Sequence, residues 1–139
     1  MKRIISTPDA PKAIATYSQA VEANGILFIS GQIAIDSATG KLVEGGIEEQ
    51  TRQVMKNIGA ILNAAGYTYM DVVKTVCLLS DIASYSRVNS IYGTFFPENP
   101  PARAAYAVAS LPMGSLVEIE TIACREVIFT LPSKHRRPS

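Results

Sequence analysis

Three predicted strands of this chain carry apolar side chains toward both faces of the sheet that they would form. They lie at 26–29, 72–79 and 116–124. Only two segments show the three- and four-residue spacing of apolar side chains that is typical of an amphipathic helix, at 47–65 and at about 82–96. Because two helices cover only one face of a sheet, we expect the second face to be buried against another subunit.

The order of the predicted elements is strands, helix, strand, helix, strands, which indicates an α+β domain with both helices on one face of a mixed sheet. Asn24-Gly25 is a strong signal for a hairpin turn, and Gly66 takes the usual position after a helix end. With 139 residues, of which 47% are hydrophobic, the chain has enough apolar side chains for one core. We expect a single domain over 1–128 and a flexible C-terminal tail over 129–139.

A stretch in the last third of the chain places one arginine among small apolar residues and two carboxylates in a predicted strand. Strand alternation puts Glu118 and Glu120 on the same face as Ile122. A carboxylate held there must be hydrogen-bonded, ion-paired or protonated, because burying an isolated charge is costly. Arg103 is the nearby cation. One interpretation is a structural Arg–Glu pair that closes the sheet, and the other is a functional site.

Composition excludes several classes of protein. A net charge of +1 argues against a strongly basic nucleic-acid surface. His135 is the only histidine and lies in the basic run 134–137 of the tail, so we expect neither a zinc site nor a histidine-based triad. The chain also lacks the glycine-rich motifs of nucleotide sites, so we expect no cofactor.

Two cysteines, Cys77 and Cys124, lie in apolar strand patterns without the spacing of a metal site. We expect both to be buried, reduced thiols, as is usual in a reducing compartment. There is no long apolar stretch that would form a signal sequence or a membrane span. The expectation is a soluble, cytoplasmic protein.

The charged stretch resembles the signature of the RidA/YjgF family, the reactive-intermediate deaminases formerly described as endoribonuclease L-PSP or translation initiation inhibitors. The resemblance rests on segments that occur in the family's order over roughly residues 2–126: Tyr17-Ser18-Gln19-Ala20, Ser30-Gly31-Gln32-Ile33, Asn63-Ala64-Ala65-Gly66, Val73-Lys74-Thr75, Val88-Asn89, Pro101-Ala102-Arg103, Leu111-Pro112 and Val117-Glu118-Ile119-Glu120.

The resemblance implies a chorismate-mutase-like fold and a homotrimer whose sheets enclose a central barrel. It also implies active sites in the clefts between subunits, so that residues far apart in one chain meet across an interface. The implied activity is hydrolysis of reactive 2-imino and enamine acids, such as 2-aminoacrylate and 2-iminopropanoate, to pyruvate and ammonia. Neither a metal nor another cofactor is required, because the iminium carbon is already electrophilic.

We expect Arg103 to grip the carboxylate of a small 2-imino or 2-oxo acid with both guanidinium nitrogens. Glu118 would activate the attacking water and return a proton as ammonia leaves. Glu118 is preferred to Glu120 because it matches the first glutamate of the family motif; strand parity alone does not separate the two. Tyr17 matches a family tyrosine of the cleft, although unaided it would be interpreted as an edge-strand aromatic.

The resemblance adds Ser30, Gly31, Ala105 and Asn89 to the substrate-binding residues. The Ser-Gly backbone lines the pocket in this family, and a glycine lets a ligand come close. Ala105 stands where many members have a cysteine, so an activity that depends on that thiol is absent here, whereas hydrolysis that uses the backbone is retained. Asn89 is expected to bind substrate or to brace its neighbours.

Two other functions stay open. A regulatory trimer that binds small carboxylates without turnover would need Arg103 but not Glu118. A ribonuclease or translation inhibitor is the other, and the near-neutral charge and the lack of a histidine outside the tail count against it.

Overall fold

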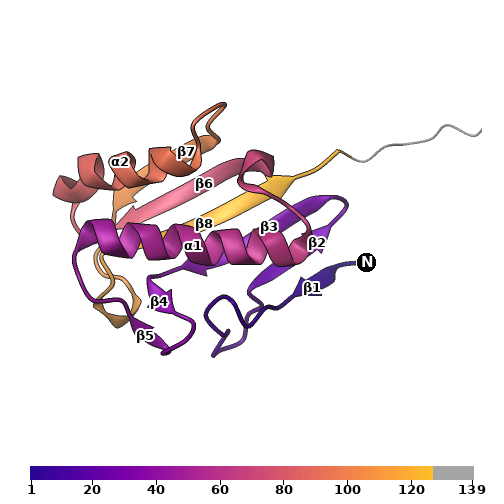
Figure 1. Cartoon of the computed structure of the whole chain (residues 1–139), viewed down its shortest axis with the longest axis horizontal. Helices are drawn as coiled ribbons and strands as arrows, with labels where there is room; N and C mark the ends of the chain where they lie inside the picture. Colours follow the sequence, from indigo (N-terminus) through magenta and orange to yellow (C-terminus); the bar gives the residue numbers. More distant parts are fainter. Residues whose placement is uncertain (127–139) are drawn as a thin grey trace, which may run out of the picture.

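The computed structural model describes residues 1–126. Its six-stranded sheet has the order β1-β2-β3-β8-β6-β7, in which β6 and β7 pair in parallel and the other neighbours are antiparallel. Both long helices lie across one face of this sheet (Figure 1). The predicted α+β class with a mixed sheet is therefore confirmed. The bounds are β1 Arg3–Ile5, β2 Ala20–Ala23, β3 Ile26–Gln32, β6 Val72–Leu79, β7 Ala102–Ala107, β8 Val117–Cys124, α1 Ile47–Ala65 and α2 Tyr85–Phe95.

The hydrophobic core lies between the helices and the sheet. Alternate residues of β8 point into it: Val117, Ile119, Thr121 and Ala123 are buried, whereas Glu118, Glu120, Ile122 and Cys124 face the other side. The apolar stripe of α1 lies against this layer, as the three- and four-residue spacing predicts, and its fully buried members include Val54 and Ile61.

Turn chemistry sets the ends of several elements. Asn24 and Gly25 have φ values of 52° and 74° and form the tight turn between β2 and β3, which confirms the predicted hairpin. Gly66 ends α1 with a φ of 84°, and its N–H donates to the carbonyls of Leu62 and Asn63. These left-handed conformations are the reason that glycine and asparagine occupy these positions.

A second, two-stranded sheet joins β4 (Ile35–Asp36) to β5 (Lys41–Leu42). The sequence indicates only a polar turn there. Short 3₁₀ turns complete the fold, namely η1 (Tyr69–Asp71), η2 (Ile82–Ser84) and η3 (Pro112–Gly114). The second predicted helix, at about 82–96, consists of η2 followed by α2.

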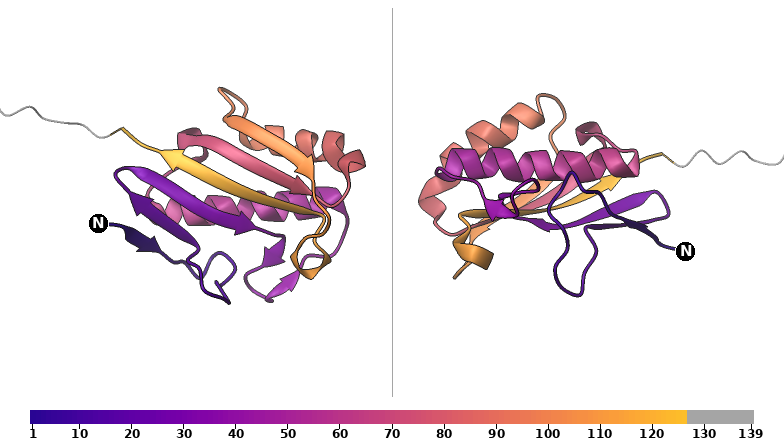
Figure 2. Two further views of the ribbon diagram at one scale, coloured as in Figure 1. Left: turned by 180° about the vertical axis from the view of Figure 1, so that it is seen from behind. Right: turned by 60° about the horizontal axis from the view of Figure 1, so that its bottom comes forward.

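The sheet face away from the helices is open within one chain (Figure 2, left). Large apolar side chains lie on it: Phe28 is 46% exposed and Tyr106 is 51% exposed, and Ile122 and Leu78 are half-buried beside them. Two helices thus leave one apolar face uncovered, as the sequence predicts.

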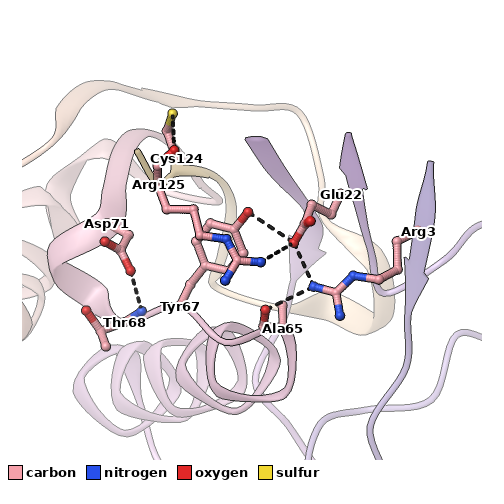
Figure 3. Close-up of polar contacts among 8 residues, drawn as sticks. All are labelled: Arg3, Glu22, Ala65, Tyr67, Thr68, Asp71, Cys124 and Arg125. Carbon is pink, nitrogen blue, oxygen red and sulfur yellow. Dashed lines mark hydrogen bonds and ion pairs between the residues drawn. The ribbon is translucent and has the colours of Figure 1, made fainter. Parts of the chain in front are cut away.

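Glu22 holds together four segments at the end of the sheet where the chain begins (Figure 3). One of its carboxylate oxygens lies 2.6 Å from Arg3 Nη2 and 3.0 Å from Arg125 Nη2, and it accepts a hydrogen bond of 3.1 Å from the hydroxyl of Tyr67. Arg3 also donates to the carbonyl of Ala65, the last residue of α1. The hydrogen bond from Arg3 is the main reason that the pKa of Glu22 is below its usual value.

The two thiols differ in burial. Cys77 is buried and free, as predicted. The prediction of burial is wrong for Cys124, which is free and exposed because it ends β8 on the open face. None of the helices within residues 1–126 combines the length and the hydrophobicity that a membrane span requires. The predicted tail at 129–139, with its basic run and His135, lies outside the described residues.

Candidate active site

A cavity of about 420 Å³ opens where β3 ends and β8 begins, and it brings together Tyr17, Gly31 and Glu118. These three predicted residues form what we call the glutamate half-site. The loop before β2, the β4–β5 hairpin and η3 lie beside these strand ends (Figure 2, left). The remaining lining residues are Pro11, Lys12, Ile14, Gln19, Gln32, Ile33, Ile35, Ser37, Gly40, Pro112 and Met113.

A β-bulge places Gly31 directly beneath the Glu118 side chain. The register between β3 and β8 shifts between Ile29 and Gln32, so the intervening residues leave the regular ladder. A Cβ atom on Gly31 would lie 2.9 Å from Oε1 of Glu118 and 3.0 Å from its Cδ, which is too close for ordinary contact. The absence of a side chain at position 31 is what lets this carboxylate lie against the backbone of β3.

Ser30 supports the cavity rather than lining it. Its hydroxyl donates a 2.6 Å hydrogen bond to the carbonyl of Ser18, and its N–H donates to the carbonyl of Gln19. These bonds tie the bulge to the loop that carries Tyr17. Tyr17 precedes β2 and lines the cavity, so it is not an edge-strand aromatic.

Burial gives Glu118 a raised pKa. The side chain is half-buried, and desolvation is the main cause, followed by the like charge of Glu120. The ion pairs of the described residues involve Glu22 and leave both of these carboxylates without a cation. A carboxyl group whose proton is held more tightly than usual is suited to accept a proton and to return it.

Gln19 is a buried residue beside the cavity that is not among the predicted site residues. Its Oε1 accepts a 2.7 Å hydrogen bond from the N–H of Thr7, and its Nε2 donates to the carbonyls of Thr7, Ala10 and Pro11. These four bonds fix the long loop before β2 in one conformation. The sequence signal for this role is the position of Gln19 directly before a predicted strand. A glutamine that is buried there must find hydrogen-bond partners for its amide group.

Arg103 lies in β7, at the opposite edge of the sheet from β1, and its side chain packs on α2. Its Nη1 donates a 2.6 Å hydrogen bond to Oδ1 of Asn89, and its Nη2 donates a 2.8 Å bond to the hydroxyl of Tyr85. The guanidinium also lies 5.0 Å from the ring centre of Tyr92. We call Arg103, Asn89 and Tyr85 the arginine half-site.

The two half-sites lie on opposite faces of the sheet within one chain. Arg103 pairs with Thr75, whose hydroxyl bonds Tyr92 on the helix side. Glu118 pairs instead with Leu78 and faces the open side. Glu120 lies on the same face as Glu118, so the interpretation of a structural pair between Arg103 and either glutamate within the chain is wrong. Because side chains alternate between the two faces of a sheet, a shift of one residue in the pairing register moves a side chain to the other face. This alternation separates Arg103 from Glu118.

Ala105 and Cys77 lie near Arg103 and do not line the cavity. Ala105 packs against the core, in register with Cys77 of β6. Burial raises the pKa of the Cys77 thiol to about 11, with Arg103 acting in the opposite direction, so this thiol is protonated at neutral pH and is a poor nucleophile.

The described residues contain no group of His, Cys, Asp and Glu side chains that would hold a metal ion.

Comparison with known proteins gives consistent matches over most of the chain. The family model described as Endoribonuclease L-PSP matches residues 7–125. The chain is 52% identical over 123 residues to the 2-iminobutanoate/2-iminopropanoate deaminase of Rattus norvegicus. The aligned region covers 88% of this chain and 90% of the rat protein.

Solved structures agree. YyfA of Yersinia pestis, of the conserved Rid protein family, has a TM-score of 0.88 and 51% identity, covering 90% of this chain and 100% of its own. TdcF of E. coli with bound serine has a TM-score of 0.86 and 35% identity, covering 89% of this chain and 99% of its own.

Proposed function

This chain belongs to the endoribonuclease L-PSP (RidA/YjgF) family, and we propose that it hydrolyses reactive 2-imino acids and their enamine tautomers to 2-oxo acids and ammonia. The observation that carries the proposal is the half-buried Glu118, which lies over Gly31 in the cavity with a raised pKa. Similarity to proteins named 2-iminobutanoate/2-iminopropanoate deaminase supports the same reaction.

In the proposed mechanism, Glu118 takes a proton from a water molecule while the water oxygen bonds to the iminium carbon. The protonated carboxyl group then gives this proton to the nitrogen of the carbinolamine. The carbon–nitrogen bond breaks as the carbonyl group forms, and the hydroxyl proton leaves with the ammonia as ammonium. The reaction balances with water alone, so we propose that the protein needs no cofactor.

Arg103 is proposed to bind the substrate carboxylate. Asn89 and Tyr85 accept hydrogen bonds from the guanidinium and hold its plane, which reduces the rotamer entropy lost when a carboxylate binds in two-point fashion. Tyr17 is proposed to orient the substrate through its hydroxyl. For Ser30 and Ala105 we propose indirect roles. Ser30 holds the bulge in place through its hydrogen bond to Ser18. Ala105 packs the strand that carries Arg103 against the core.

A complete site needs both half-sites, which one chain places on opposite faces of its sheet. We therefore propose a homotrimer in which the arginine half-site of one subunit meets the glutamate half-site of its neighbour. The exposed Phe28 and Tyr106 on the open face support an assembly that buries this face, and the family resemblance implies three sheets around a central barrel.

The activity is tested by generating 2-aminoacrylate from serine with a serine dehydratase and by following its loss with and without the protein. Acceleration above the spontaneous rate, unchanged by EDTA, is the expected result. No acceleration at any protein concentration would refute the proposal.

The composite site is tested by mixing two inactive variants. Arg103→Ala lacks the clamp and Glu118→Gln lacks the base, so neither homotrimer should be active. After the two are unfolded and refolded together in equal amounts, about a quarter of the sites should combine an intact Arg103 with an intact Glu118. If activity does not return, although refolded parent protein is active, the two half-sites do not meet across subunits.

A second candidate is a regulatory trimer that binds small carboxylates without turnover. TdcF of E. coli, a 35% identical relative, favours this candidate because its solved structure holds bound serine, which is a small carboxylate. A binder needs Arg103 but gains nothing from a carboxylate with a raised pKa. Binding of 2-oxo acids without any acceleration of imine hydrolysis would favour this candidate.

A further inference from the structure

Apolar side chains make up much of the cavity lining around Glu118. They come from three separate segments and include Ile14, Ile33, Ile35, Pro112 and Met113. The imine derived from alanine has a side chain of one methyl group, which is small for a cavity of about 420 Å³. Pockets of about 300–1,000 Å³ commonly hold larger ligands. The glutamate half-site of one chain thus has apolar surface that the smallest substrate does not use.

Met113 is held at this cavity in an unusual conformation. Its φ and ψ are 57° and 23°, in the left-handed region of the backbone. Residues other than glycine, asparagine and aspartate rarely adopt this conformation. Pro112 precedes it, and both the N–H and the hydroxyl of Ser115 donate to the carbonyl of Pro112, which closes the turn. The methionine side chain is nevertheless 57% exposed, so core packing does not compensate for its strained backbone.

Ile14 is a second exposed aliphatic side chain of the lining. It is 82% exposed and lies in the loop that Gln19 fixes. Within one chain, Ile14 and Met113 therefore lie exposed at the cavity on two separately braced loops. Such side chains gain contacts when an apolar group enters beside them.

We infer that Met113 is a specificity-determining residue that contacts the side chain of the 2-imino acid and favours long apolar side chains, such as those of the imines derived from leucine and methionine. This inference rests on the proposed function. A thioether is flexible and polarizable, so one methionine fits apolar groups of different shape. An acidic side chain is disfavoured, because Glu118 lies in the same cavity.

The test compares two substrates in the parent protein and in two variants. An L-amino acid oxidase supplies the imine derived from alanine or from leucine, and semicarbazide traps the imine that is not hydrolysed. Met113→Asn keeps a residue that accepts the left-handed conformation but replaces the apolar side chain with an amide. It should lower kcat/KM for the leucine-derived imine by about fivefold to tenfold more than for the alanine-derived imine.

Met113→Leu is the matched control, because it keeps an apolar side chain of similar size. Its ratio of kcat/KM values should stay within about twofold of the parent ratio. Calorimetric affinities for 4-methyl-2-oxopentanoate and pyruvate give a second readout that needs no turnover, and the Asn variant should again lose more affinity for the larger acid. Equal ratios in all three proteins, in both assays, would overturn the role of Met113. A parent protein that hydrolyses neither imine would instead refute the proposed function, while the calorimetry still decides on Met113.

Discussion

Gly31→Ala is the substitution whose effect is most closely set by the geometry of the site. The new Cβ would lie 2.9 Å from Oε1 of Glu118 and 3.2 Å from its Cγ. To restore an ordinary contact of 3.4 Å, the carboxylate must move by at least about 0.5 Å. Because a misplacement of about 1 Å costs on the order of 100-fold in rate, we expect kcat/KM for 2-iminopropanoate to fall by about 10- to 100-fold.

The fold should tolerate this change. Gly31 has no positive φ, and the atoms that an added Cβ meets belong to the free end of a side chain. The free energy of unfolding, measured with urea, should therefore change by less than about 1 kcal/mol. Gly93→Ala is the matched control, because a Cβ there meets nothing within 4 Å.

A double-mutant cycle separates the clash from other effects. In a Glu118→Ala background, the atoms that meet the new Cβ are gone, so Gly31→Ala should have little further effect on the residual rate. Parent activity in the single Gly31→Ala variant, with its fold intact, would show that the position of this carboxylate does not matter for the reaction.

Three further predictions concern charge and assembly. Because a general base works deprotonated, the raised pKa of Glu118 should place the acid limb of the kcat/KM profile above pH 4.5, the usual pKa of a glutamate. Glu120→Gln removes a like charge and should move this limb to lower pH. A limb that does not move would contradict the coupling between the two carboxylates. Asn89→Ala removes a bond to Arg103 and should weaken pyruvate binding by about tenfold in calorimetry, whereas unchanged affinity would remove Asn89 from the clamp. Ile122→Glu places a charge on the open sheet face and should give monomers in light scattering; a stable trimer would argue against burial of this face.

Local signals predicted much of the fold. Asn24-Gly25 and Gly66 were correctly identified because a left-handed turn restricts which residues fit, whatever the rest of the chain does. The helix at Ile47–Ala65 followed from its apolar stripe. The small β4–β5 sheet was missed, since strands of two residues are too short to show alternation.

The candidate site was only partly predictable, because it depends on register and on burial. Strand parity placed Glu118 and Glu120 on one face, but the pairing of β6 with β7 and β8 decides that Arg103 faces the other one. The same limit explains Cys124, whose apolar neighbours indicated burial although it lies at the exposed end of β8. The bracing role of Gln19 depends on carbonyls of a loop that has no sequence pattern.

The central claim is that Glu118 is the general base of an imine hydrolysis, and Glu118→Gln tests it most directly. The amide keeps the shape of the side chain but does not accept the proton of water. With 2-aminoacrylate generated in situ, the variant should be about 100-fold slower than the parent or worse, while its affinity for pyruvate, which Arg103 is proposed to bind, should be largely retained. Hydrolysis by Glu118→Gln at the parent rate would contradict the account.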